Sequence, residues 1–305
     1  MGLSIQQQLG QNTTVEVGYE GTRSVHEMQI FEFNDARPGP EPRIERRPFP
    51  ALTPYRVLMG NGDQSYNALN FKVEKRPDND GITMLFAYTW AKSLDTTGGR
   101  LSIVGDPRGI SRNLLGNLRQ NQGRGEANIP GRLAALGGYD IPFGPGRQFG
   151  ADSLAGKVLG GWSVFTLATF QKGQWHTIFD TDRLDVVSNV TQRPDLIGDP
   201  NSGRRTSEQW INTAAFADPA AFTYGNAGRG IAEGPGVINV DLSVLREFQL
   251  AEEMRLKFRF EAFNIANHGN LLPSNSTWDY TAGSFGSIGS SGKGRELQFG
   301  LKIYY

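Results

Sequence analysis

Several residue types that build common functional sites are missing or rare in this sequence. It contains no cysteine and only three histidines among 305 residues. The lack of cysteine excludes disulfide bonds, thiol catalysis and thiolate metal ligands. His26, His176 and His268 are scattered, and none has a second ligand at the spacing of known metal sites. We therefore expect these histidines to be loop or solvent-facing residues, and we predict no cofactor.

Long hydrophobic runs are missing as well. No window approaches 18 apolar residues, so the sequence predicts no transmembrane helix. A membrane β-barrel remains possible, because its strands carry a much weaker hydropathy signal. The formal net charge is zero and no basic block is present, so nucleic acid is not an expected partner.

The first residues show no export signal. Residues 1–6 (MGLSIQ) have neither a basic region nor an apolar core, and they resemble the middle of a strand. A barrel of the outer membrane must be exported. If the chain is one, we expect its N-terminal part to lie outside this sequence.

What the sequence does contain is glycine, 39 residues of it, together with stretches of alternating polarity. The clearest stretch is 295–305, where every second residue from Leu297 to Tyr305 is apolar or aromatic. Such alternation predicts a strand with one apolar face. Its length suits a tilted membrane strand of about 9–11 residues. An antiparallel sheet with one wet face would show the same pattern.

The remaining alternation predicts about nine antiparallel strands in all, and the connections between them differ in length. The strands are expected at 3–9, 13–19, 65–75, 82–90, 133–141, 162–170, 240–248, 254–261 and 295–305. Short turns are expected at 10–12, 77–81 and 251–253, and a medium connection at 142–161 with one helical turn at 154–159. Long polar loops are expected at 21–63, 91–130, 172–237 and 266–294.

This sorting of connections favours a transmembrane β-barrel, which has short periplasmic turns and long extracellular loops. Charged positions of the later strands would then face a wet lumen. Aromatic residues near strand ends suit the interfacial girdles: Tyr19, Tyr88, Trp90, Trp162, Tyr304 and Tyr305. Bacterial single-chain barrels have even strand numbers, so we predict that residues 1–305 are the C-terminal part of one larger barrel domain, without a plug.

A set of short motifs in a fixed order adds a family resemblance. They are YNAL (66–69), AYTWAKSLD (87–95), IPFGPGR (141–147), GGW (160–162), RPDLIGDP (193–200), WINTAAF (210–216), GNAGR (225–229), GPG (234–236), RFEAFN (259–264), NH (267–268) and GRELQFGLK (294–302). Together they resemble the C-terminal barrel region of TonB-dependent receptors of the Oar-like type.

The resemblance implies a receptor of the bacterial outer membrane, embedded in its lipid. It also implies a plug and contact with the TonB system, both through an N-terminal part that is missing here. In such receptors the terminal strand resembles the signal read by the barrel assembly machinery, which here would consist of Phe299, Leu301, Ile303 and Tyr305.

Few residues stand out as candidates for chemistry, and no catalytic residue is nominated. Asp180, Asp182 and Asp185 could offer oxygen ligands to Ca²⁺, but the spacing does not match an EF-hand loop and a solvated acidic loop is favoured. Residues 287–294 fail the phosphate-loop pattern. Four loop aromatics could stack on a ligand or pack the loops together: Trp175, Trp210, Trp278 and Tyr280.

Two other functions stay open at this point. A soluble or surface-attached β-sheet module that binds a ligand such as a carbohydrate would need short strands and a second sheet over the apolar faces. An outward-facing barrel hydrolase would need a Ser/His/acid cluster, with His176 or His268 as the histidine.

Overall fold

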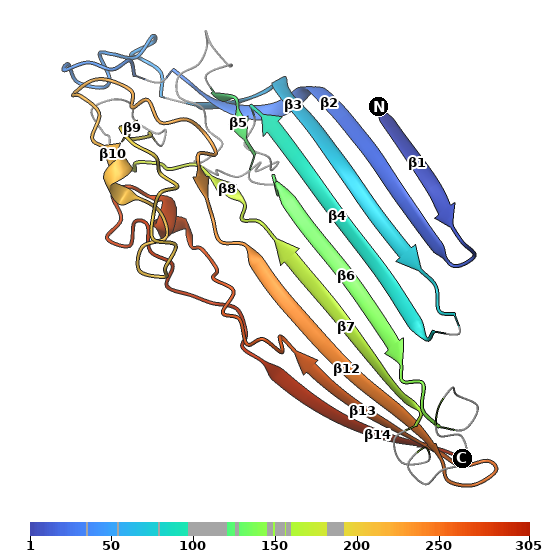
Figure 1. The fold of residues 1–305 in the computed structure, drawn as a ribbon. Coiled ribbons are helices and arrows are strands. Elements are labelled where there is room, and N and C mark those ends of the chain that lie inside the picture. Colours follow the sequence, from blue (N-terminus) through green and yellow to red (C-terminus); the bar gives the residue numbers. More distant parts are fainter. Residues whose placement is uncertain are drawn as a thin grey trace.

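The computed structural model describes the chain except residues 35, 54, 79, 97–120, 126–127, 145–148, 150–155, 157–159 and 182–191, and except the side chains of 29–32, 56 and 275. Nine strands follow one another in an antiparallel sheet, in sequence order (Figure 1). They are β1 (Gly2–Leu9), β2 (Thr13–Phe33), β3 (Tyr55–Lys75), β4 (Ile82–Asp95), β6 (Gly131–Asp140), β7 (Trp162–Gln171), β12 (Val237–Gln249), β13 (Arg255–Phe263) and β14 (Glu296–Tyr304). The short β5 (Gly123–Arg124) pairs with β4. Within the described residues, no helix is long and apolar enough to cross a membrane.

The connections are sorted by length between the two ends of the sheet. The links β1–β2, β3–β4 and β12–β13 are short and lie at one end, which we name the turn end (Figure 1). The long links lie at the other end, the loop end, where they gather beside β8 (Trp175–His176). The strand pattern is therefore as predicted. The sorting of the loops holds with one exception, because the β6–β7 link at 141–161, predicted as a medium connection, also lies at the turn end and is as long as the β2–β3 link at 34–54.

The first long loop is shorter than predicted, because the sequence was expected to leave the sheet over 21–63. Instead β2 and β3 each continue to 21 residues and pair with one another as far as Phe33 and Tyr55. A ladder that extends beyond the lipid needs no apolar face, so alternation fades there although pairing continues. A bulge interrupts it near His26, whose φ is +61°.

The register of the strands gives the sheet two chemically different faces. One row across the sheet consists of Val15, Val73, Phe86, Ala135, Ala168 and Val240. The neighbouring row on the opposite face consists of Glu16, Lys72, Ala87, Ala134, Thr169 and Asn239. We name these the apolar face and the polar face. Side chains alternate along a strand, so one pairing register fixes both faces.

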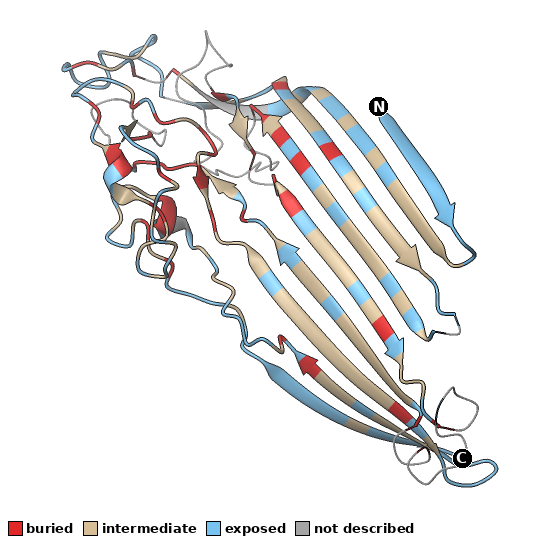
Figure 2. Ribbon diagram, viewed as in Figure 1, coloured by how far each residue is buried: buried red, intermediate tan, exposed pale blue. Residues whose placement is uncertain are grey.

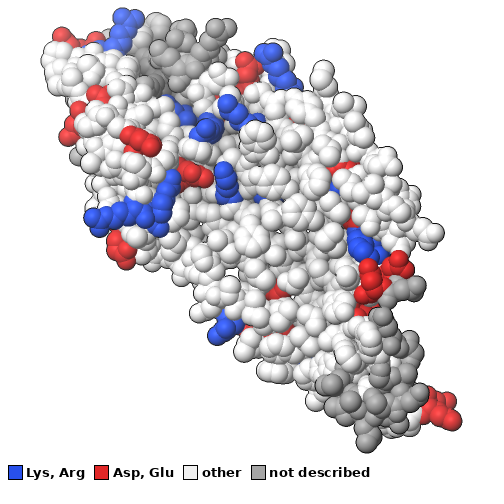
Figure 3. Space-filling model, viewed as in Figure 1, with Lys and Arg blue, Asp and Glu red and all other residues white. Residues whose placement is uncertain are grey.

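The apolar face is not covered by any described part of the chain. Leu3, Leu69, Phe170 and Ile238 on this face are exposed, and Figure 2 shows few buried positions along the strands. Figure 3 looks onto a face of the sheet whose middle carries few charged side chains, since these gather toward its ends. The described residues thus place no second sheet over the apolar face. A wide uncovered apolar band is instead what a wall in contact with lipid requires.

The buried core lies in the loops rather than in the sheet (Figure 2). Two short ladders, β8 with β11 (Ala232–Glu233) and β9 (Asp195–Leu196) with β10 (Phe216–Ala217), organise the loop predicted at 172–237. With the 3₁₀ turns Thr213–Ala215 and Asn275–Trp278 they enclose one cluster of side chains. Its members are Ile178, Phe179, Ile211, Ala215, Phe216, Ala232 and Trp278. We name this unit the loop lobe. The helical turn expected at 154–159 lies outside the described residues, apart from Gly156.

Candidate functional site

The polar face collects charges that could not face lipid. Near the turn end, Arg255 Nη1 lies 3.1 Å from the Glu247 carboxylate across the β12–β13 pair. Further along, Arg259 forms an ion pair with Glu261. Each such cation turned toward lipid would cost about 2–4 kcal/mol at the bilayer midplane. The polar face is therefore the wet side of the sheet, in agreement with the sequence-based expectation.

An apolar patch interrupts this polar face beside β6, β7, β12 and β13. A shallow hollow of about 200 Å³ is lined there by Leu136, Leu167 and Phe263, next to Asp241 and Glu261. Sequence reasoning missed the patch, although these three residues occupy positions where alternation predicts polar side chains. That mismatch is the signal that could have revealed it. Apolar groups on a wet face favour contact with another part of the protein or with a bound molecule.

The loop lobe is attached to the wall by a buried ion pair. Arg229 Nη2 donates to the backbone oxygen of Asp95 at 2.6 Å and forms an ion pair with its carboxylate. Both side chains are 2% exposed. Nearby, the Gly230 amide donates to Thr177 Oγ1 at 3.1 Å. The end of β4 and two segments of the loop lobe are thus held together without access to water.

Three of the four predicted loop aromatics pack inside the loop lobe. Trp278 is 2% exposed and stacks on His176, with 4.1 Å between the ring centroids. Trp210 Nε1 donates to the Glu233 backbone oxygen at 2.8 Å. Tyr280 packs edge-on against Phe285. Burial raises the pKa of the Tyr280 phenol, and the charges of nearby aspartates raise it further.

The fourth loop aromatic, Trp175, lies at the border between the loop lobe and the sheet. It belongs to β8, and the Arg124 guanidinium carbon lies 3.6 Å from the centroid of its ring. A cation over an indole ring is a favourable contact, worth about 0.5–2 kcal/mol. Arg124 was not predicted from the sequence. It is positioned by β5, which has only two residues and is too short to show an alternating pattern.

Of the histidines and acidic residues noted in the sequence, His176, His268 and Asp180 pack against or bond to neighbouring parts of the loops. His176 stacks on Trp278, while the backbone of His268 bonds to the side chain of Asn264. Asp180 is buried, and its backbone pairs with Gln192. Asp182 and Asp185 lie outside the described residues. Among the residues that the structure does describe, no three acidic or histidine side chains gather as a metal site.

The terminal strand β14 presents Phe299, Leu301 and Ile303 on the apolar face, and Tyr305 directly follows its last residue. Phe299 is 70% exposed and Leu301 71%, and Ile303 and Tyr305 are exposed as well. Phe299 also contacts the Phe260 ring of β13 at 4.9 Å. The strand pairs only with β13 in the described chain, so its other edge is open.

Lys75 and Arg246 are cations on the apolar face near the turn end, and Lys75 forms an ion pair with Asp80. Arg246 occupies the row of Trp162 and Phe258, and its guanidinium carbon lies 4.1 Å from the Phe248 ring centroid. Sequence reasoning missed it, although the series Val240, Leu242, Val244, Arg246, Phe248 places it on this face. Aromatic rings shield the charge from an apolar environment.

A single sheet with an uncovered apolar face, a charged wet face and loops sorted to one end has the construction of a transmembrane β-barrel wall. The sequence matches the outer membrane beta barrel domain family over residues 1–298. The chain therefore belongs to this family, and its location is the outer membrane. No curated protein matches the sequence.

The fold is similar to parts of several proteins of known structure. The outer membrane transporter YddB from Escherichia coli is 10% identical, with a TM-score of 0.51 over 99% of this chain and 32% of YddB. FpvA of P. aeruginosa, solved with pyoverdines bound, is 12% identical with a TM-score of 0.43, covering 99% of this chain and 27% of FpvA. The ferric-catecholate import receptor Fiu from E. coli K12 is 10% identical with a TM-score of 0.40, covering 99% and 34%. The likeness to YddB shows that the sheet resembles part of a TonB-dependent receptor barrel. The chain spans about a third of the length of the three proteins.

Proposed function

We propose that this chain is the C-terminal part of the barrel wall of a TonB-dependent outer-membrane receptor of the Oar-like type, which takes up an unidentified ligand. The observation that carries the proposal is the likeness to the YddB transporter, which covers nearly all of this chain but only 32% of YddB. The ordered motifs from YNAL at 66–69 to GRELQFGLK at 294–302 support the finer family assignment.

The open edges of the sheet support a larger barrel. In the described chain β1 pairs only with β2, and β14 only with β13. Unpaired backbone groups cost several kcal/mol each within lipid, so membrane sheets close on themselves. In this proposal the strands that complete the barrel come from outside residues 1–305, together with a plug that contacts the TonB system. The apolar patch at Leu136, Leu167 and Phe263 is available for packing inside the lumen.

Ligand selection is assigned to the loop end. Trp175, Trp210 and Tyr280 are half-buried there, so they retain surface that a ligand could contact. Trp278 is buried and supports them by packing. The exposed row Phe299, Leu301, Ile303 and Tyr305 is assigned to recognition by the barrel assembly machinery.

No specific observation favours the two other functions. A soluble binding module needs a second layer over the apolar face, and the described residues leave that face uncovered. For the hydrolase, the ring contact of His176 is with Trp278, and the backbone of His268 bonds to the side chain of Asn264. Neither function is proposed.

The proposal is tested by reading the genomic DNA upstream of the codon for Met1. We expect the reading frame to remain open through additional strands, a plug, a TonB-contact segment and an export signal. A stop codon followed by a ribosome-binding site directly before Met1 would contradict the receptor assignment. Membership of the barrel family would not be affected by that result.

A further inference from the structure

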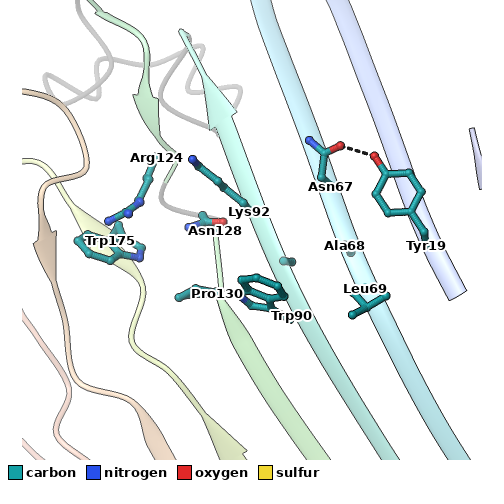
Figure 4. Close-up of a pocket in the computed structure, with 11 residues that line it drawn as sticks. Tyr19, Asn67, Ala68, Leu69, Trp90, Lys92, Arg124, Asn128, Pro130 and Trp175 are labelled. Atoms are coloured by element: carbon teal, nitrogen blue, oxygen red, sulfur yellow. Dashed lines mark hydrogen bonds between the residues drawn. The ribbon is translucent and has the colours of Figure 1, made fainter. Parts of the chain in front are cut away.

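A hollow of about 460 Å³ lies at the loop end of the sheet, beside β2, β3 and β4 (Figure 4). Its apolar wall includes Leu69, Trp90 and Pro130. Leu69 and Trp90 are paired across β3 and β4, and they are 45% and 63% exposed. This large apolar surface has no covering side chain among the described residues.

The hollow is on the lipid side of the wall and not in the lumen. Tyr19, Leu69 and Trp90 form one row of the apolar face, because Tyr19 pairs with Leu69 and Leu69 with Trp90. Trp90 is eight residues beyond Ile82, where β4 begins. At about 3.4 Å per residue and about 40° of tilt, Trp90 lies roughly 20 Å above the turn end. That height corresponds to the outer border of the lipid band, where aromatic residues gather.

Two cations border the hollow, and no carboxylate among the described residues neutralises them. Lys92 extends toward β5, and Arg124 extends from β5 over Trp175 (Figure 4). Neither forms an ion pair with a described residue, and no Asp or Glu is among the lining residues. Trp175 Nε1 is buried and has no described hydrogen-bond partner. On the far side, Tyr19 donates to Asn67 Oδ1 at 2.6 Å and so fixes that wall.

We propose that this hollow binds an anionic lipid of the outer leaflet. An acyl chain packs along Leu69, Trp90 and Pro130, and Lys92 and Arg124 bind the phosphate of the head group. Trp175 Nε1 is the neutral donor beside them. Charge complementarity selects an anionic head group, and the apolar wall selects a lipid over a free anion. The inference goes beyond the proposed receptor function and rests only on the location of the chain in the outer membrane.

Native mass spectrometry of the full-length protein in detergent tests the proposal, with phosphatidylglycerol and phosphatidylcholine of equal chain length as probes. We expect phosphatidylglycerol to bind more tightly than phosphatidylcholine. Each cation near a membrane surface contributes enough for about a fivefold change in affinity. Lys92→Gln and Arg124→Gln should each weaken phosphatidylglycerol binding about fivefold, and the double variant about thirtyfold.

A matched control removes two cations from the opposite face, with Arg132→Gln and Lys302→Gln. These residues lie on the polar face, so the control should leave lipid binding unchanged. Millimolar inorganic phosphate should not displace the lipid, whereas efficient displacement would indicate an anion site and overturn the proposal. Equal affinity for the two lipids in the unaltered protein would also overturn it, and that measurement does not depend on the folding of any variant.

Discussion

At the scale of single residues, the most consequential contact is the buried pair Asp95–Arg229. Both side chains are almost inaccessible to water, and the guanidinium also donates to the Asp95 backbone oxygen. Burying two charges carries a desolvation penalty that their attraction offsets only while both are present. The pair therefore stabilises the attachment of the loop lobe to β4 only as a unit.

We predict that Arg229→Met loosens the loop lobe. Removing one partner of a buried pair leaves an uncompensated charge and costs about 3–5 kcal/mol. Limited proteolysis of the full-length protein in detergent should show faster cleavage within 192–236. Arg204→Met is the matched control, because Arg204 is an exposed arginine of the same loop lobe. Equal resistance of the Arg229 and Arg204 variants to protease would contradict the prediction.

At the scale of elements, the lipid-facing strands could be predicted from sequence. The alternation at Ile82, Met84, Phe86, Tyr88 and Trp90 is imposed by lipid on one side and water on the other. Where a strand leaves the lipid this requirement ends, which is why the outer halves of β2 and β3 escaped prediction. Backbone hydrogen bonds hold these outer halves together. Such bonds do not depend on side-chain polarity, so they produce no pattern in the sequence.

The loop lobe and the hollow beside it could not be predicted in the same way. Ile178, Ile211 and Trp278 come from distant segments and show no common periodicity. Residue type and position in the loops were enough to nominate Trp175, Trp210, Trp278 and Tyr280. They did not indicate which residues these side chains contact. Lys92 and Arg124 become neighbours of one hollow only through the pairing of β5 with β4.

We predict that the loop lobe can unfold while the barrel stays intact, since its core is separate from the sheet. Trp278→Ala should destabilise the lobe by about 3–5 kcal/mol, as expected when a buried aromatic is truncated. Protease sensitivity at 192–236 should rise, and heat-modifiable migration of the barrel should persist. The exposed Trp90→Ala provides the comparison and should leave the lobe resistant. Loss of heat-modifiable migration in Trp278→Ala alone would show that lobe and barrel unfold together.

At the scale of the whole molecule, the two faces of one sheet explain both the location and the architecture. The apolar face meets lipid, the charged face encloses water, and most of the long connections lie on one side of the membrane. The same division explains why a chain of modest hydropathy needs no buried core within its sheet. Lipid covers the apolar face of its strands, where a soluble protein would need a second layer of structure.

The measurement that tests this account most directly uses two consecutive alanines of β6. Ala135 lies on the apolar face between Phe86 and Ala168, and Ala134 lies on the polar face between Ala87 and Thr169. Both are half-buried. Each is replaced by arginine in the full-length protein, and folding free energy in lipid vesicles is measured by urea titration. We predict a loss of about 2–4 kcal/mol for Ala135→Arg and little change for Ala134→Arg. Equal losses, or a larger loss for Ala134→Arg, would contradict the assignment of the apolar face to lipid.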